Sequence, residues 1–522
     1  MRVYLSKYFW TGKDNIRVTG FIRMGNEYLT DDGLLNYFNG VDTIIEFEQK
    51  LKSANGQFSV IIKTPDEIWA ATDRLRNYPL FYTRHNFTNI ISDDCYRLAE
   101  MKSDKRFNQE AVDCFLMAGH VINNLTLIDN VFQIEAGEYV ILGSSVTRKF
   151  YYDSTFDPIL DKDFTTLATE LHCVILNVFE AHFKALSDNF IAISLSGGFD
   201  SRLVAAMCAK YHPENVICYT FGIKNNPEVA PAEEIAKRLG FKWFFIEYNS
   251  AQIEGFLDDK NFNEYYPYAS NLSGMFYMQD YFAVKYLKEN KLVPENCVFI
   301  PGFSGDMLAG GHLTPIMHKK LGKNILAKEI FKEFFNLINL KREKQINLIK
   351  LIGDKIPTGK FESWKVFETW DQKQRQSKFI VNSARVFSFF GYKYVLPLFD
   401  NLLIDFFSEL PFQFKLDKKL YDYVLTEVIF REFSLNLSKE LNPRSSQKSF
   451  QRLKERIKPF IPTIILNYFV NQKCPVFYDA ITKTMLEGID PQQIIRPRQA
   501  NYYNAYITQW YLIKTRELFG IR

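Results

Sequence analysis

An apolar run that ends in a glycine-rich hexapeptide constrains the fold of this chain more than any other feature. The run 190–195 has the length and composition of a buried strand, and Ser196-Gly197-Gly198-Phe199-Asp200-Ser201 follows it directly. A strand that leads through a Ser/Gly-rich turn into a helix presents backbone N–H groups and hydroxyls to a phosphate, and the helix dipole favours negative charge there. The segment therefore predicts a pyrophosphate cradle at the carboxyl end of a strand.

The aspartate of this hexapeptide indicates a cation. A carboxylate beside a phosphate is unfavourable unless a cation lies between them, so Asp200 suggests Mg²⁺. The hexapeptide does not fit the GxxxxGKS/T loop, but it resembles the SGGxDS loop of ATP pyrophosphatases, which cleave ATP between its α and β phosphates. For six residues taken alone, an ordinary strand-to-helix turn is the alternative.

Strands and helices alternate on both sides of the hexapeptide. The pattern predicts helices over 165–185, 202–210 and 232–239, and strands over 190–195, 216–220, 243–246 and 298–301, the last ending in a second Gly-rich turn. This spacing implies parallel βαβ units and a doubly wound sheet, which binds ligands at the carboxyl ends of its strands. From Lys319 onward the pattern is helical, and we expect a helical half packed on the sheet.

The first 150 residues follow a different pattern. Runs rich in β-forming residues alternate with turn residues at 58–63, 68–72, 80–83, 90–92 and 138–142. One helix is expected to begin near Asn108. This pattern favours a mainly antiparallel, layered domain. The acidic, Pro-containing stretch 153–158 interrupts both periodicities, so we expect domains over residues 1–153 and 164–522.

Composition argues against several classes of protein. With 64 basic and 60 acidic residues, the charge is too balanced to indicate a nucleic-acid or membrane partner. The seven cysteines form no CxxC pair, so we expect reduced thiols and no zinc site. The first residues lack the apolar core of a signal peptide, and no stretch approaches the ~18–20 apolar residues of a membrane span. A cytoplasmic location is therefore expected.

Further segments, in order along the chain, resemble the asparagine synthetase family. Residues 219–223 (YTFGI) resemble its adenine-side segment, and 302–306 (GFSGD), followed by Gly310-Gly311, resemble its GEGSDE and GGY motifs. Residues 391–400 (GYKYVLPLFD) resemble GVEARVPFLD. In the amino-terminal domain, 56–58 and 72–82 resemble landmarks of that family's glutamine amidotransferase domain. The resemblance spans roughly Gly56 to Asp400.

The resemblance implies an α/β fold in two parts. The first is a degenerate, Ntn-hydrolase-like layered β-rich domain. The second is a doubly wound, parallel-sheet ATP-pyrophosphatase domain of the adenine nucleotide α-hydrolase type, with a helical C-terminal half. Members of the family adenylate a carboxylate with ATP and Mg²⁺, release pyrophosphate, and let an amine displace AMP. The implied partners are a small-molecule carboxylate and an ammonia or amine donor, with a homodimer or a partner glutaminase left open.

The resemblance also implies roles for individual residues. Asp200 and Asp306 would hold Mg²⁺. Lys448 lies near the position of the family's catalytic lysine, although a solvated basic helix explains it equally well, and Lys393 could pair with a substrate carboxylate. The residues expected around ATP and its pyrophosphate are Leu195, Ser196, Gly197, Gly198, Asp200, Ser201, Phe221, Gly222, Gly302, Ser304 and Gly305.

Other positions depart from the family. Glutamine hydrolysis there requires an amino-terminal cysteine, whereas residue 2 here is Arg and the first cysteine is Cys95, so we expect no glutaminase activity from the first domain. Phe303 replaces the glutamate of GEGSDE and can accept no proton. Lys393 carries a positive charge where GVEARVPFLD has a glutamate.

The leading hypothesis is an ATP-dependent amide ligase that acts on a carboxylate other than aspartate, with free ammonia, an amine or a partner's ammonia. One alternative is a non-catalytic protein that binds ATP or a partner subunit. A second is a glutamine-hydrolysing asparagine synthase that uses a partner glutaminase. A third is another adenylating activity, such as thiolation, which the cysteine positions do not support.

Overall fold

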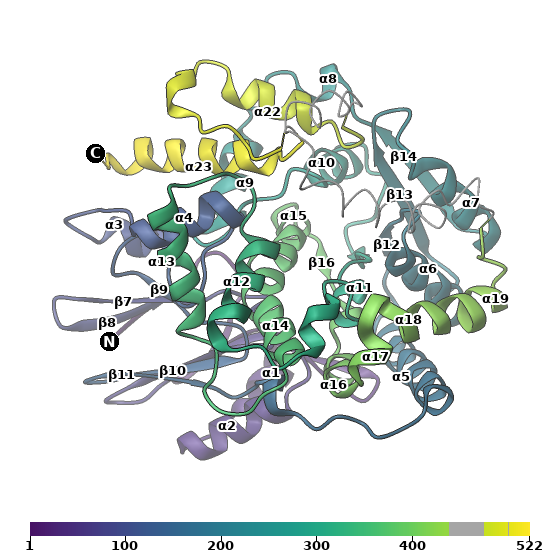
Figure 1. Ribbon diagram of the computed structural model, residues 1–522, viewed down its shortest axis with the longest axis horizontal. Helices are drawn as coiled ribbons and strands as arrows, with labels where there is room; N and C mark the ends of the chain where they lie inside the picture. Colours follow the sequence, from purple (N-terminus) through teal and green to yellow (C-terminus); the bar gives the residue numbers. More distant parts are fainter. Residues whose placement is uncertain (438–473, 500, 522) are drawn as a thin grey trace.

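A five-stranded parallel sheet organises the C-terminal part of the computed structural model, which describes residues 1–437, 474–499 and 501–521 (Figure 1). The strand order is β14-β13-β12-β15-β16. Chain order therefore reverses beside β12, and the switch point of the sheet lies between β12 and β15. The strands are β12 (Ile191–Ser194), β13 (Val216–Gly222), β14 (Lys242–Glu247), β15 (Val298–Phe299) and β16 (Lys393–Tyr394).

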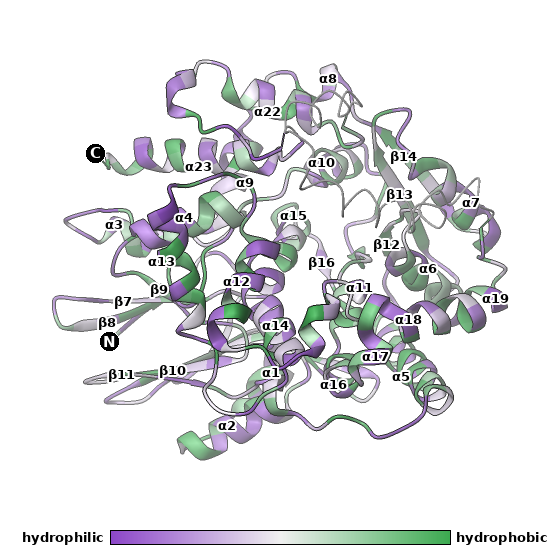
Figure 2. Cartoon of the chain, in the orientation of Figure 1, coloured by the Kyte–Doolittle hydropathy of each residue, from purple (hydrophilic) through white to green (hydrophobic). Residues whose placement is uncertain are grey.

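The predicted βαβ alternation is confirmed. Helices α5 (Phe164–Ala185), α6 (Phe199–Tyr211) and α7 (Val229–Leu239) pack against one another and the sheet. Asp163 accepts hydrogen bonds from the backbone N–H groups of Thr165 and Thr166 in the first turn of α5, and Gly240 ends α7 in the left-handed conformation. Hydrophilic and hydrophobic residues alternate along α5 (Figure 2), as expected for a helix with one buried face.

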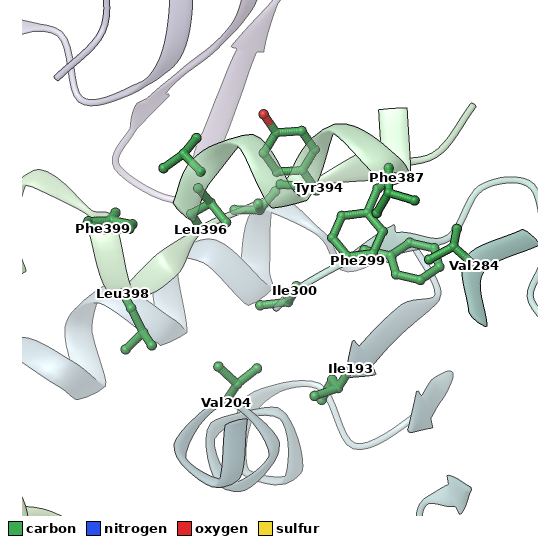
Figure 3. Close-up of a cluster of buried hydrophobic side chains, with 14 of the residues drawn as sticks. Ile193, Val204, Val284, Phe299, Ile300, Phe387, Tyr394, Leu396, Leu398 and Phe399 are labelled. Atoms are coloured by element: carbon green, nitrogen blue, oxygen red, sulfur yellow. The ribbon is translucent and has the colours of Figure 1, made fainter. Parts of the chain in front are cut away.

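The core of this part gathers side chains from both faces and from the helical half (Figure 3). The rings of Phe299 in β15 and Phe387 in α15 (Arg385–Phe389) stack with their centroids 4.5 Å apart. The other side chains labelled in Figure 3 are Ile193, Val204, Val284, Ile300, Tyr394, Leu396, Leu398 and Phe399.

The region after Lys319 is helical, as predicted, with one exception. Residues 393–394 form β16, which extends the sheet by pairing with β15. A strand of two residues carries no recognisable period, so the pattern did not reveal it. The helices described here are α12 (Lys323–Phe334), α13 (Arg342–Gly353), α14 (Ser363–Trp370), a π-helix (Asp371–Ile380), α16 (Asn401–Glu409), α17 (Phe412–Lys415), α18 (Lys419–Tyr423), α19 (Phe430–Glu432), α22 (Tyr478–Leu486) and α23 (Asn504–Phe519).

Three short helices lie between β14 and β15, and a fourth follows β15. They are α8 (Ser250–Ile253), α9 (Lys260–Ser270), α10 (Tyr281–Glu289) and α11 (Gly305–Leu308). No helix in the described part of the chain is long and apolar enough to cross a lipid bilayer.

Two sheets form the amino-terminal part. The larger has the order β11-β10-β6-β5-β3-β2, with β4 on β3, and the smaller has the order β1-β8-β7-β9. Pairing between these strands is antiparallel, except for the parallel pair β1 and β8. The strands are β1 (Arg2–Tyr4), β2 (Thr11–Lys13), β3 (Ile16–Met24), β4 (Glu27–Thr30), β5 (Gly56–Lys63), β6 (Ile68–Thr72), β7 (Phe81–His85), β8 (Thr88–Ser92), β9 (Phe132–Gln133), β10 (Glu138–Leu142) and β11 (Val146–Phe150).

The sheets pack face to face, and helices cover them, so the predicted layered arrangement is present. Ile61 and Ile68 of the larger sheet share a core cluster with Tyr82 and Ile91 of the smaller one. Helices α1 (Asp31–Phe38) and α2 (Ile44–Ser53) cover the other face of the larger sheet, while α3 (Cys95–Glu100) packs on β7 and β8. Helix α4 (Gln109–Ala118) begins after its cap Asn108, as predicted.

A buried polar cluster joins the amino-terminal and C-terminal parts. The Arg23 guanidinium contacts the Asp400 carboxylate at 2.9 Å, and both side chains are less than a tenth exposed. His182 Nε2 lies 3.1 Å from the same carboxylate, and its Nδ1 lies 2.5 Å from the Tyr28 hydroxyl. Because a buried charge is costly without a partner, this cluster fixes how the two parts pack.

Candidate functional site

Two glycine-rich turns meet at the switch point of the parallel sheet. The SGGFDS turn (196–201) follows β12, and the second turn (302–306) follows β15, the neighbouring strand. A Cβ added at Gly302 would lie 2.2 Å from the Ser201 Cα, and one added at Gly305 would lie 2.8 Å from Asp200 Oδ1. Both glycines are therefore required for the turns to approach this closely.

Hydrogen bonds within the SGGFDS turn hold its shape. The backbone N–H of Ser196 donates to Ser201 Oγ, and that of Gly198 donates to Ser196 Oγ, each at 3.1 Å. The Gly197 N–H donates to Glu228 Oε2 at 2.7 Å. One backbone donor of the turn thus already binds an anionic oxygen, and a phosphate oxygen could take the place of this carboxylate oxygen.

Two carboxylates lie together where the turns meet. The backbone N–H of Asp306 donates to Asp200 Oδ2 at 3.2 Å, and the Tyr421 hydroxyl donates to Asp200 Oδ1 at 3.0 Å. Burial, together with the negative charge of Asp306, raises the pKa of Asp200 to about 7. A cation bound between these carboxylates would relieve both effects.

The oxygen donors of this pair fit Mg²⁺. Mg²⁺ is usually held by one or two carboxylates, with phosphate oxygens and water completing its shell. Within the described residues, no group of three His, Cys, Asp or Glu side chains has the arrangement of a metal cage. Asp200 and Asp306 would therefore hold the ion together with a phosphate ligand, which matches their position beside the SGGFDS turn.

The second turn is supported from behind by the π-helix. Ser304 adopts a left-handed backbone conformation (φ 75°), and its buried hydroxyl donates to Gln376 Oε1 at 2.8 Å. Gln376 in turn donates to Asp371, whose other oxygen lies 2.6 Å from His312 Nδ1. The Ser304 side chain therefore faces the protein interior. Its predicted role as a pyrophosphate ligand is not supported for the hydroxyl.

A cavity of about 470 Å³ opens beside the SGGFDS turn. Of the residues predicted to bind ATP or its pyrophosphate, Leu195, Ser196, Phe221 and Gly302 line it. Phe303, which departs from the family pattern, also lines it. The remaining lining residues are Ser194, Thr220, Asn226, Pro227, Glu228, Tyr277, Gln279, Asp280, Pro301, Ile380, Ser383, Phe387, Pro475 and Val476.

Phe221 and Gly222, which were predicted to lie beside the adenosine, are at the end of β13. The ring of Phe221 stacks on Tyr248, with centroids 5.4 Å apart and planes 17° apart. Gly222 has φ 126°, and a Cβ there would lie 2.2 Å from the Pro475 carbonyl oxygen. That carbonyl accepts a hydrogen bond from the Ile223 N–H at 2.9 Å. Glycine is thus needed at 222 because another part of the chain crosses the strand end.

Three residues of the site were not among the predicted ones: Lys418, Tyr421 and Asp280. Asp417 and Lys418 both have φ 60°, a conformation that is unfavourable outside glycine, and the Lys418 ammonium lies 5.8 Å from the Phe199 ring centroid. The positive charge of Lys418 acts on Asp200. Each of the three lies about 80 or more positions from the SGGFDS turn, and no motif marks it.

Lys393, one of the two predicted catalytic lysines, does not line this cavity. Lys393 is exposed and pairs in register with Val298, the residue at which β15 begins, whereas the cavity lies at the carboxyl ends of the strands. This placement gives no support to a contact between Lys393 and the substrate, which stays a prediction. Lys448 lies outside the described residues.

Comparison with known proteins gives one family for the region that holds this site. The family model described as asparagine synthase matches residues 183–433. A glutamine-hydrolysing asparagine synthetase from Bacillus subtilis is 24% identical over 201 residues, covering 37% of this chain and 31% of the relative. A putative glutamine-hydrolysing asparagine synthetase from Methanocaldococcus jannaschii is 23% identical over 348 residues, covering 59% of this chain and 64% of the relative.

The chain spans less than two thirds of the length of either relative. Among solved structures, the NH3-dependent NAD synthetase from Campylobacter jejuni is 15% identical, covering 38% of this chain and 100% of that one. Its TM-score of 0.20 is too low to bear on function.

Proposed function

Because the asparagine synthase family model matches residues 183–433, we propose that this protein is an ATP-dependent carbon–nitrogen ligase. It activates a carboxylate as an acyl adenylate, releases pyrophosphate, and transfers the acyl group to ammonia or an amine. The observation that carries the proposal is the meeting of Asp200 and Asp306 from two glycine-rich turns at the switch point. Two carboxylates beside an anion-binding turn are suited to a metal-bound polyphosphate.

The turns supply binding groups for the triphosphate. In the proposed complex, backbone N–H groups of 196–198 hold the pyrophosphate, and the oxygen that now binds Gly197 N–H at 2.7 Å gives way to a phosphate oxygen. Asp200 and Asp306 would hold Mg²⁺, which when bound neutralises charge on the leaving pyrophosphate. Lys418 adds a fixed cation on the same side, next to Phe199 of the turn.

The acyl substrate would occupy the part of the cavity lined by Phe303 and Phe387. The carboxylate attacks the α-phosphorus of ATP, and the pyrophosphate leaves. An amine then attacks the acyl carbon, and AMP leaves. Phe303 cannot accept the proton that the amine loses, so this step relies on another group. The aromatic lining favours a substrate other than aspartate, because these rings do not stabilise the second carboxylate of aspartate.

We propose ammonia or an amine, rather than glutamine hydrolysed by this chain, as the nitrogen source. Cys95, Cys114, Cys208, Cys218 and Cys297 are buried, and burial raises the pKa of each thiol. Thiols of this kind are poor nucleophiles because the thiolate is the reactive form.

Pyrophosphate release from ATP by the purified protein, measured with a panel of carboxylic acids, tests the proposal. We expect release that depends on an acid and on Mg²⁺, and its loss in Asp200→Ala. Absence of release with every amino acid, uronic acid and simple acid in the panel would contradict ligase activity. Glutamine hydrolysis by the protein alone would contradict the proposed nitrogen source.

A second candidate, ATP binding without turnover, is favoured by one observation. Phe303 places an apolar ring, which cannot accept a proton, at the cavity position where the family carries a glutamate. Under this alternative, the parent protein would bind ATP with Mg²⁺ but release no pyrophosphate. Asp200→Ala would bind ATP more weakly. Equilibrium binding of ATP, measured beside the release assay, separates the two functions.

A further inference from the structure

Asp280 is a half-buried carboxylate that lines the cavity beside the SGGFDS turn. It directly precedes helix α10, where an aspartate ordinarily caps the helix by accepting a hydrogen bond from a backbone N–H. No such bond is present at α10, so the carboxylate is not used as a cap. A side chain that is not required by the local fold is available for a ligand.

Nothing in the described part of the chain neutralises this carboxylate. Its hydrogen-bond partner is Ser194, a neutral hydroxyl at the end of β12. Lys, Arg and His are absent from the described lining of the cavity. Burial raises the pKa of Asp280 to about 7, although the bond from Ser194 opposes the shift. A carboxylate in such a setting is stabilised when a cation arrives.

The surroundings of Asp280 suit an organic cation better than a metal ion. Tyr277, Phe303 and Phe387 line the same cavity. Aromatic rings beside one carboxylate are the usual setting for an alkylammonium group, because the ring faces attract the cation and the rings contact its methylene groups. A small metal ion would instead require several oxygen ligands at fixed geometry.

We propose that Asp280 is the anionic end of a subsite that binds an ammonium group of the ligase substrate. This inference rests on the proposed function only in assuming that the bound molecule is a substrate of the ligase reaction. The binding of an ammonium group is inferred from the residues that line the cavity. The ammonium group could belong to the acid that is adenylated or to the amine that accepts the acyl group. In either case, the subsite selects against substrates with a second free carboxylate near Asp280, because like charges would meet there.

Binding measurements on the full-length protein test the subsite without requiring turnover. The probes are 6-aminohexanoate and 1,5-diaminopentane, each compared with hexanoate, in calorimetry and thermal unfolding. We expect both amines to raise the Tm of the parent protein by about 1–2 °C at ten times their Kd, and hexanoate to bind at least about tenfold more weakly than 6-aminohexanoate. Asp280→Asn should weaken amine binding at least about tenfold.

The matched control is Asp258→Asn, an exposed aspartate outside the cavity, which should leave amine binding unchanged. Equal amine binding by Asp280→Asn and the parent protein would overturn the proposal. So would a loss of ATP affinity in Asp280→Asn with amine binding unchanged, because Asp280 would then contact the nucleotide.

Turnover distinguishes the two sources of the ammonium group. If the adenylated acid carries it, 6-aminohexanoate and not hexanoate promotes pyrophosphate release. If the acceptor carries it, hexanoate suffices for release and 1,5-diaminopentane accelerates amide formation. Amine binding that depends on Asp280, without release by any acid, supports the subsite and contradicts ligase activity. Release without Asp280-dependent amine binding supports the ligase and overturns the subsite.

Discussion

The backbone N–H of Asp306 donates a hydrogen bond to the carboxylate of Asp200, 106 positions earlier in the chain. This bond joins the turns that follow β12 and β15, and it places two carboxylates side by side. Burial and the negative charge of Asp306 raise the pKa of Asp200 to about 7. The ionised form of Asp200 is therefore unfavourable without a cation. In the proposed function, this pair binds a metal ion and destabilises the fold when the ion is absent.

Asp200→Asn should abolish metal-dependent stabilisation while making the metal-free protein more stable. The parent Asp200 binds its proton more tightly in the folded than in the unfolded state, where its pKa is near 3.9. The metal-free protein therefore loses stability as pH rises from about 4 to about 7. At pH 8, we expect Asp200→Asn without metal to gain about 1–2 kcal/mol in unfolding free energy.

Denaturation at pH 5 and pH 8, with Mg²⁺ and with a chelator, measures these effects. Mg²⁺ should stabilise the parent protein at pH 8 and leave Asp200→Asn unaffected. A variant that still gains stability from Mg²⁺ would show that the ion binds elsewhere.

Gly302→Ala should inactivate the site through the backbone. An alanine Cβ would lie 2.2 Å from the Ser201 Cα, so the two turns would have to separate. We expect pyrophosphate release to fall at least about 100-fold, because small displacements at a reacting centre have effects of this size. The matched control is Gly322→Ala, where no atom lies within 4 Å of the added Cβ and the backbone is extended (φ −65°). Equal loss in both variants would point to a general folding defect.

Parallel strand ends made part of this site predictable. Asp200 and Asp306 each follow a strand of a doubly wound sheet, and such strand ends share one edge, so the sequence was enough to place both carboxylates in one site. The same reasoning could not be applied to Lys393, because the two-residue strand β16 has no period from which its register could be inferred. The sequence pattern also did not predict β3, because its alternation of buried and exposed residues is interrupted at Gly20 (φ 93°).

Lys418 and Asp280 could not be predicted because their positions depend on how separate helices pack. Lys418 precedes α18 and Asp280 precedes α10, and in the sequence each reads as an ordinary residue at a helix start. Only the packing of α18 against α5 and α17, and of α10 against α15, brings them to the turns. Contacts between distant segments of this kind carry no local periodicity or motif.

Lys418→Ala should slow pyrophosphate release by about tenfold or more, since it removes a cation beside the proposed phosphate site. The adjacent Lys419 supplies a matched control, because it is exposed and its ammonium lies over Phe164 and Phe414, away from the turns. Lys419→Ala should retain near-parental release. Single-turnover assays with saturating ATP distinguish slower chemistry from weaker binding. Equal rates for Lys418→Ala and the parent protein would exclude Lys418 from the site.

Asp400→Asn should destabilise the junction between the two parts of the chain in a pH-dependent way. Burial alone would raise the pKa of Asp400, but the hydrogen bond from His182 and the charges of His182 and Arg23 lower it well below its usual range. A lowered carboxyl pKa stabilises the fold above the unfolded pKa of about 3.9, and this contribution is lost as pH falls below that value.

At pH 7 we expect Asp400→Asn to lower the unfolding free energy by about 3–5 kcal/mol, because Arg23 would remain buried without its charge partner. The control is Asp405→Asn, which breaks the Arg74–Asp405 pair at a carboxylate that is 46% exposed and should cost at most about 1 kcal/mol. Urea denaturation at pH 7 and pH 3.5 should show the difference between Asp400→Asn and the parent protein shrinking at the lower pH. A difference that stayed constant between the two pH values would assign the loss to packing rather than to the ionised carboxylate.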